Sequence, residues 1–547
     1  HTLVPEGKGY KKVPVQEKDF FKEEVRDGLS KITFVFPNLT EGAIIEYRYK
    51  LVSTGIRQPR TWYFQNEIPT LWSEVRLTSP MYFEYTTLRN NLKPFTYDKK
   101  LESTYQFGIE EDVYNVMTQT ALENIPPLEE EPYITNIDDL RQRMEFQLSR
   151  QNFKNGLAEN YLSTWPEFNT QMMQQEYVGD QIEKTVYHRK LKLAAKEVLA
   201  TIKDQKDPIK TLYDFVQDQV KWNGEYSKYT EHSLDRALDQ KSANSGEMNM
   251  MFIRLLKEAG FEANPVLIAT RSYGKIEQTF PVANKFNHLI TAVKSNEAWQ
   301  LIDVSHPNYD LDLLPIDCLN DVGFMMNLKE GPQWINIDAP VYKERSGLTV
   351  RFEEDQFNVT VQSRFENYAA LLERQQYANQ GNTNYFKNWS EEDLTVTKGE
   401  LLSDKNQKTI FATKLSFEKE VDLESEFLYL NPMFGYNLTD NPFDAEQRNL
   451  PVDFPYPIEN DLIISLQIPE NMEIVELPES QKFQLPNKDG MYQYQVNNTG
   501  NTIQIRSRFE LNRTFYKPDQ YEQLKDLFDY MLEKQNELIV LKMKANK

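Results

Sequence analysis

The sequence predicts a multidomain α+β protein. Its 547 residues allow about three domains, at roughly 100–200 residues per domain. Hydrophobic residues alternate in the N-terminal part, recur every three to four positions in the middle, and alternate again toward the C-terminus. These periods are typical of strands and helices respectively. We therefore expect an antiparallel β domain at 1–125, an α+β core with preceding helices at 126–340, and a β-sandwich-like domain with a terminal helix at 341–547.

The N-terminal part is expected to form antiparallel strands. Apolar residues alternate from Ile32 to Phe36 and again from Ile45 to Leu51, with Pro37 and Gly42 in the loop between them. The first thirty residues show no clear pattern. A segment rich in Pro and Glu, from Ile125 to Pro132, predicts the boundary to the central part.

The central part should begin with helices and end with strands. Helices are predicted near Thr164, from Leu191 to Lys203, and after Asp207-Pro208, where Asp serves as N-cap and Pro occupies the first helical position. A further apolar helix covers 250–259, and strands follow over 264–335.

The C-terminal part returns to alternating strands between 348 and 509, separated by turn residues. A helix is predicted from about Pro518, with an apolar stripe from Tyr521 to Ile539. This stripe either docks on the protein's own core or binds a partner.

Composition excludes several classes of function. The net charge of −21 argues against nucleic acid as a partner, because phosphate binding needs basic patches. The single cysteine and five scattered histidines predict no disulfide and no metal centre. Neither a phosphate-binding glycine loop nor a nicotinamide fingerprint is present, so no cofactor is expected. The chain also lacks the run of about 18–20 apolar residues that a transmembrane segment requires.

Three residues form the candidate catalytic site. Ser245 precedes an apolar helix, His288 begins an apolar strand, and Asp303 ends the next strand. A serine hydroxyl is neutral at pH 7 and attacks only when an aligned base removes its proton, as in Ser-His-Asp sites that also have an oxyanion hole. Alternatively, Ser245 is a helix N-cap or first-turn residue, and His288 and Asp303 are a buried hydrogen-bonded pair.

Other polar residues near this site are assigned more modest roles. Cys318 follows Asp303 and does not begin a helix, so we expect a structural residue rather than the nucleophile. His306 is expected in a loop. Trp222 either lines the cleft or packs in the core, and Glu247 is expected to balance the helix dipole.

Several motifs occur together in one order along the chain. They are Phe34 to Tyr47, Trp62 to Pro69, Trp222-Asn223-Gly224, Asn244-Ser245, Asn249, Leu255 to Phe261, Phe286-Asn287-His288 and Arg448 to Phe454. With these motifs the chain resembles large bacterial proteins of the transglutaminase-like superfamily. The resemblance implies a papain-like core between β-rich domains, the first of them incomplete at its start. It also implies a catalytic Cys at the position of Ser245, so that Ser245, His288 and Asp303 form a remnant triad.

The function implied by this resemblance is that of a pseudoenzyme. We expect an exported binding or scaffold protein for a protein, peptide or glycan partner, periplasmic or otherwise exported in a Gram-negative bacterium. The resemblance also allows association with an envelope complex. The chain starts at His1 without Met, which is compatible with removal of a signal peptide or of further upstream residues. The alternative is an active peptide-directed serine hydrolase or acyltransferase that uses Ser245, His288 and Asp303.

Overall fold

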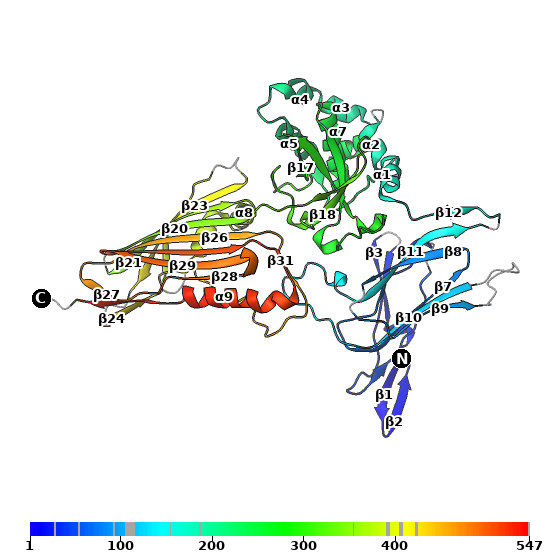
Figure 1. Cartoon of the computed structure of the whole chain (residues 1–547), viewed down its shortest axis with the longest axis horizontal. Coiled ribbons are helices and arrows are strands. Elements are labelled where there is room, and N and C mark those ends of the chain that lie inside the picture. The colour runs from blue at the N-terminus through cyan, green and yellow to red at the C-terminus, as the bar shows by residue number, and fades with distance from the viewer. Residues whose placement is uncertain are drawn as a thin grey trace. The chain divides into compact units, whose positions relative to one another are not determined.

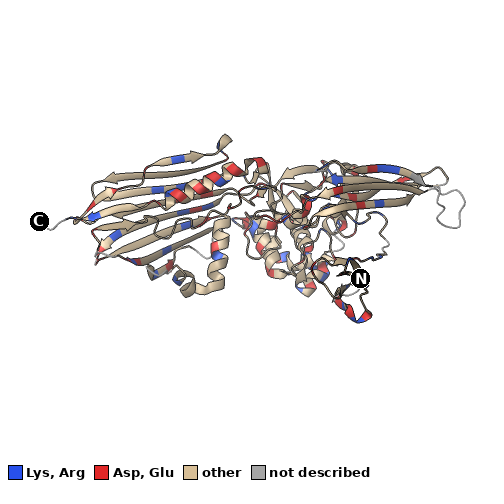
Figure 2. Cartoon of the chain, turned by 90° about the horizontal axis from the view of Figure 1, so that it is seen from below, with Lys and Arg blue, Asp and Glu red and all other residues tan. Residues whose placement is uncertain are grey.

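The computed structural model describes residues 1–26, 29–52, 55–90, 93–103, 115–153, 155–184, 188–353, 355–389, 394–403, 408–421 and 425–544. The chain divides into two compact units, His1–Arg60 and Thr61–Lys547. Figure 1 shows the order of the elements, and Figure 2 shows acidic and basic residues interspersed along strands and helices. Among the described residues, no helix has both the length and the apolar character needed to cross a bilayer. The domain limits at 125 and 340 stay predictions.

The first unit consists of two small antiparallel sheets. Their strands are β1 (Thr2–Glu6), β2 (Gly9–Val13), β3 (Phe20–Arg26), β4 (Leu29–Phe34) and β5 (Ile44–Ile45). The strand predicted from Ile45 to Leu51 was wrong beyond Ile45. The neighbouring strand β1 begins at Thr2, which pairs with Ile45, so the antiparallel register ends there. Tyr47, Tyr49 and Leu51 are exposed.

The second unit opens with strands that form two sheets. They are β6 (Trp62–Tyr63), β7 (Thr70–Pro80), β8 (Phe83–Asn90), β9 (Tyr97–Ser103), β10 (Asn115–Ile125), β11 (Arg143–Asn152) and β12 (Ala158–Asn160). One sheet has the order β7-β10-β9, and in the other β11 pairs with β6, β8 and β12. Phe64, Leu122 and Met144 are central residues of the core between these strands.

Helices and a five-stranded sheet make up the next layer. The helices are α1 (Trp165–Met173), α2 (Gly179–Glu183), α3 (Arg189–Ala194), α4 (Lys196–Thr201), α5 (Pro208–Gln219), α6 (Leu234–Gln240) and α7 (Ser245–Glu258). The antiparallel sheet has the order β17 (Ala298–Ile302), β16 (His288–Ser295), β15 (Ala263–Ile268), β18 (Val322–Met325) and β19 (Gln333–Asn336). Helix α7 packs on β15 and β16 with one side and on α5 with another, so almost all of it is buried.

Local signals explain where two of these helices start. Asp207 accepts a hydrogen bond from the Lys210 amide, and Pro208 opens α5, as predicted. The single helix predicted from Leu191 to Lys203 was wrong. It is two short helices separated at Ala195, which is fully buried, followed by a 3₁₀ turn. Nothing in the local sequence marks this break, because alanine is the best helix former.

The C-terminal part is built on an eight-stranded sheet. In sheet order the strands are β22 (Leu394–Leu401), β23 (Ile410–Glu420), β21 (Gln356–Glu366), β20 (Tyr342–Glu353), β26 (Ile458–Gln467), β30 (Thr502–Leu511), β29 (Gly490–Thr499) and β28 (Gln481–Gln484). All neighbours are antiparallel except β20 and β26. The inner face carries Leu348, Val359, Ile464 and Ile505, which pack against α8 (Tyr368–Lys387) and α9 (Tyr521–Gln535).

The terminal helix docks on its own chain. Its buried face includes Tyr521, Leu524, Leu527, Phe528 and Met531, which excludes this stripe as a free partner-binding surface. The predicted continuation to Ile539 was wrong, because the helix ends at Gln535. Ile539 instead begins strand β32 (Ile539–Met543), which pairs with β24 (Phe427–Leu430) and β27 (Met472–Glu476).

Candidate functional site

The site is built around the N-terminus of α7. Asn244 is the N-cap and accepts a hydrogen bond from the Glu247 amide, whereas Ser245 is the first residue of the helix. The Glu247 carboxylate accepts the Asn244 amide at 2.9 Å and the amides of Glu231 and His232 at 3.0 Å each. Glu247 therefore does more than balance the helix dipole, because it ties a preceding loop to the helix start.

The structure brings Ser245, His288 and Asp303 together. The Ser245 hydroxyl lies 2.9 Å from His288 Nδ1, and His288 Nε2 lies 2.8 Å from Asp303 Oδ2. Ser245 opens α7, His288 opens β16, and Asp303 follows the last residue of β17. Their exposed fractions are 0%, 0% and 1%.

Asp303 is held as a buried carboxylate. Its Oδ1 accepts Asn249 Nδ2 at 2.8 Å and both the amide and the hydroxyl of Ser305, at 2.9 and 2.6 Å. Burial by itself would raise the pKa of Asp303, but the facing His288 and His306 hold it well below its usual range. An ionised Asp303 fixes the proton of His288 on Nε2, which leaves Nδ1 to accept the proton of the Ser245 hydroxyl.

Two further side chains, His306 and Cys318, contact Asp303, and Tyr226 contacts His306; the sequence did not mark these as site residues. His306 Nδ1 lies 3.5 Å from Asp303 Oδ2, and its Nε2 lies 3.1 Å from the Tyr226 hydroxyl. Cys318 Sγ donates to Asp303 Oδ2 at 3.6 Å. Burial and the nearby carboxylate of Asp303 raise the pKa of the Cys318 thiol well above its usual value, so the thiol stays protonated.

The cluster contains potential metal ligands. Single ligand atoms of His288, Asp303 and Cys318 all lie within 4.8 Å of one another. The distance between His288 Nε2 and Asp303 Oδ2 is that of a hydrogen bond, and a zinc site would require a thiolate rather than a thiol. The geometry therefore fits a network linked by protons.

Residues 223–232, here called the covering segment, close the site. The Ser227 amide donates to the Ser245 hydroxyl oxygen at 2.9 Å, and the Ser245 amide donates to the Glu225 carbonyl at 3.0 Å. The contact is tight, since a Cβ atom on Gly246 would lie 2.6 Å from the Ser227 carbonyl oxygen. The nucleophile position and its backbone N–H are thus both occupied by the protein itself.

Additional contacts fasten the covering segment. The buried Lys228 ammonium donates to the Phe286 carbonyl at 2.7 Å, and burial lowers the pKa of Lys228 to about 8. The ring of Trp222 lies 4.2 Å from that of His306 and 5.3 Å from that of Tyr226. Trp222 is half-buried beside the site, where it packs against His306 and Tyr226.

A surface cavity of about 490 Å³ lies along the covering segment. It is lined by Asn244 and by six residues of the segment between Glu225 and Glu231. Ser245, His288 and Asp303 do not line it. In chemical terms, the three residues can pass a proton from Ser245 to His288, but the Ser245 hydroxyl is not exposed to this cavity.

Comparisons with known proteins agree with this architecture. The transglutaminase-like superfamily matches residues 192–304, which include Ser245, His288 and Asp303. A domain of unknown function with solved structures, DUF3858, matches residues 426–541. No curated protein matches the chain.

Two solved structures are similar. The crystal structure of a "putative protease" from Parabacteroides distasonis is 11% identical, with a TM-score of 0.54, over 99% of this chain and 88% of that one. A "putative cysteine protease" from Cytophaga hutchinsonii is also 11% identical, with a TM-score of 0.20, over 51% of this chain and 88% of its own. The family match and the first of these structures confirm the predicted α+β multidomain fold. This chain therefore contains a transglutaminase-like core and a C-terminal DUF3858 domain.

Proposed function

We propose that this protein is a pseudoenzyme, in which a transglutaminase-like core binds a partner and does not turn over substrate. One observation carries the proposal. The Ser245 hydroxyl is fully buried and accepts a hydrogen bond from the Ser227 amide, so the protein's own backbone occupies the position of an incoming substrate.

The chemistry of residue 245 supports the same conclusion. The resemblance implies a cysteine at this position, and a thiol near a helix N-terminus ionises easily. Serine instead requires a base and an oxyanion hole at the moment of attack. The backbone N–H of Ser245, which would point at an oxyanion, donates to the Glu225 carbonyl.

The surface cavity along the covering segment is the proposed binding site. It combines the carboxylates of Glu225 and Glu231 with the rings of Tyr226 and Tyr229. Such a surface suits a protein or peptide partner, since aromatic rings and backbone groups recognise extended chains. A glycan would use the same aromatic rings. In keeping with the resemblance, we propose that the protein acts after export to the periplasm, where it associates with an envelope complex.

The second candidate function is a serine hydrolase or acyltransferase. The distances of 2.9 and 2.8 Å along Ser245, His288 and Asp303 favour it, because they suit general-base activation. It would require the covering segment to move away from Ser245 when substrate binds.

Kinetics separate the two functions. Wild type, Ser245→Ala and Ser245→Cys are assayed with amide and ester peptide substrates, together with complementation of a deletion strain. We expect no turnover by wild type, and complementation by Ser245→Ala when the level of folded variant is matched to that of wild type, because the substitution also destabilises the core. Turnover by wild type that disappears in Ser245→Ala, together with failed complementation, would establish the serine enzyme.

A further inference from the structure

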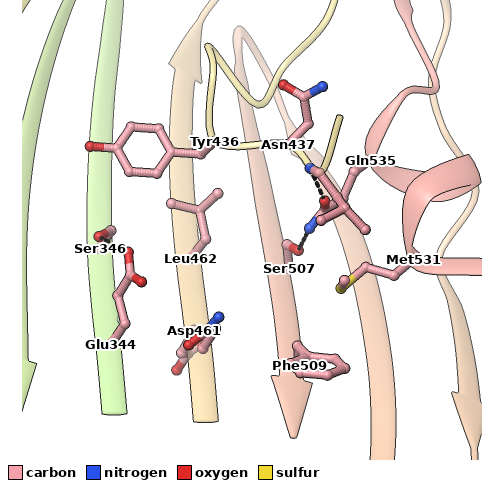
Figure 3. A pocket seen from close by; sticks show the side chains of 12 residues that line it. Glu344, Ser346, Tyr436, Asn437, Asp461, Leu462, Ser507, Phe509, Met531 and Gln535 are labelled. Carbon is pink, nitrogen blue, oxygen red and sulfur yellow. Dashed lines mark hydrogen bonds between the residues drawn. The ribbon is translucent and has the colours of Figure 1, made fainter. Parts of the chain in front are cut away.

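A second cavity lies in the C-terminal part, on the inner face of the eight-stranded sheet (Figure 3). Side chains of β20, β26, β30 and α9 line it, together with a loop that carries Tyr436. Its volume is about 210 Å³, below the 300–1,000 Å³ typical of sites for drug-sized ligands. A small molecule or a single side chain would fill it.

Polar side chains concentrate at this point of an otherwise apolar face. Further along β20 and β26 the inward positions are apolar, as at Leu348 and Ile464. At the cavity the inward positions are Glu344 and Ser346 on β20 and Asn460 on β26. Polar groups in such a place are costly unless they have partners, so their pairing is informative.

Some of the polar side chains at the cavity form hydrogen bonds with other residues of the protein. Ser507 Oγ lies 2.9 Å from the Tyr492 hydroxyl and accepts Gln535 Nε2 at 3.2 Å. Gln535 Oε1 accepts the Leu438 amide at 2.7 Å, and the dashed lines of Figure 3 mark the two Gln535 bonds. The hydrogen-bonding groups of Tyr492 and Gln535 on this side of the cavity therefore already have a partner within the protein.

The groups left over are acceptors. Asn460 Oδ1 is buried and lacks a hydrogen-bond partner among the described residues. The Glu344 carboxylate receives one long hydrogen bond, at 3.5 Å, from Ser346, whose hydroxyl is 2.8 Å from that of Ser363. A ligand that satisfies this site must bring donors.

The Glu344 carboxyl has no basic partner at the cavity, whereas the other acidic lining residue, Asp461, pairs with Arg506 at 2.8 Å. Burial raises the pKa of Glu344 to about 7, and the nearby carboxyl of Glu373 on α8 raises it further. The basic residue next to Glu344 in sequence, Lys343, pairs with Glu459 at 3.0 Å. Within the described part of the chain, the residues that line the cavity include no Lys, Arg or His.

We propose that this cavity binds a primary ammonium group on a short aliphatic chain. An ammonium group offers three donors and no acceptor, which matches the free oxygens of Glu344 and Asn460. Charge-assisted hydrogen bonds to a carboxylate are the stronger kind, and aromatic faces such as Phe509 attract cations. Leu462 and Met531 provide apolar surface for the chain. This site is independent of the proposed function of Ser245.

Calorimetric titration of the full chain at pH 8 tests the proposal, with n-butylamine hydrochloride as the probe and 1-butanol as the neutral analogue. We expect butylammonium to bind at least about tenfold more tightly than butanol, and Glu344→Gln to remove about that factor. The matched control is Glu459→Gln, which replaces a carboxylate that already pairs with Lys343. The affinity of this variant for butylammonium should stay within about twofold of that of wild type.

Two results of this comparison would overturn the proposal, besides the absence of any binding: equal affinity for the amine and the alcohol in wild type, or unchanged amine affinity in a folded Glu344→Gln protein. The first comparison needs no variant and therefore does not depend on the folding of one. The peptide acetyl-Gly-Lys-Gly-amide distinguishes the source of the ammonium group. Binding of both probes supports a lysine side chain as ligand, binding of butylamine alone supports a free small amine, and binding of neither refutes the site.

Discussion

Replacement of Ser245 by alanine should destabilise the core far more than loss of a helix cap would. The hydroxyl is fully buried, and its two short contacts are to the Ser227 amide and His288 Nδ1, both at 2.9 Å, beside a longer one of 3.5 Å to the Ser227 carbonyl. Ser245→Ala leaves both without this partner, and each buried polar group left unsatisfied costs about 1–3 kcal/mol. We expect a loss of about 2–6 kcal/mol. The sequence by itself predicted at most about 1 kcal/mol, on the assumption that Ser245 acts as the cap, a role that Asn244 fills.

Two measurements check this value. Urea unfolding gives the loss of stability, and hydrogen exchange reports locally on the Ser227 amide, which should exchange about 30-fold faster for each 2 kcal/mol lost. The matched control is Ser233→Ala, because Ser233 is a helix N-cap that accepts the Arg236 amide and should cost only about 1 kcal/mol. Equal costs for the two substitutions, with unchanged exchange at Ser227, would refute the reasoning.

Three further predictions concern the covering segment, the buried thiol and the C-terminal cavity. Gly246→Ala should push the Ser227 carbonyl away and cost about 1–3 kcal/mol, seen as faster hydrogen exchange over 223–232; unchanged exchange would contradict the close contact. Cys318 should resist Ellman's reagent at pH 8 until denaturant is added, whereas rapid labelling of the native protein would contradict its burial and raised pKa. Burial raises the pKa of Glu344 from its ordinary 4.5 to about 7, so between these pH values the folded protein holds a proton that the unfolded chain has lost, and stability falls as pH rises through them. From pH 5 to pH 8, urea unfolding should show wild type losing about 2–3 kcal/mol of stability that Glu344→Gln does not lose. The same change in stability for both proteins would refute this.

The sequence determined features that depend on neighbours along the chain. The Asp207-Pro208 pair marks the start of α5, because a cap and a fixed φ act within one turn. The change between period 2 and period 3.6 determined the α+β fold class, since a half-buried element must present its apolar residues at its own repeat. The order of Ser245, His288 and Asp303 along successive elements likewise marks the candidate site.

Only the tertiary structure decided how that site is closed and what else belongs to it. Ser227 reaches Ser245 because the covering segment folds back onto α7, and Cys318 reaches Asp303 across a chain separation of 15 residues. The same holds for the break at Ala195, which local propensity opposes. Contacts of this kind depend on how whole elements pack, and a sequence pattern records only which face of an element is buried. The surface that buries each face is therefore set by packing in three dimensions.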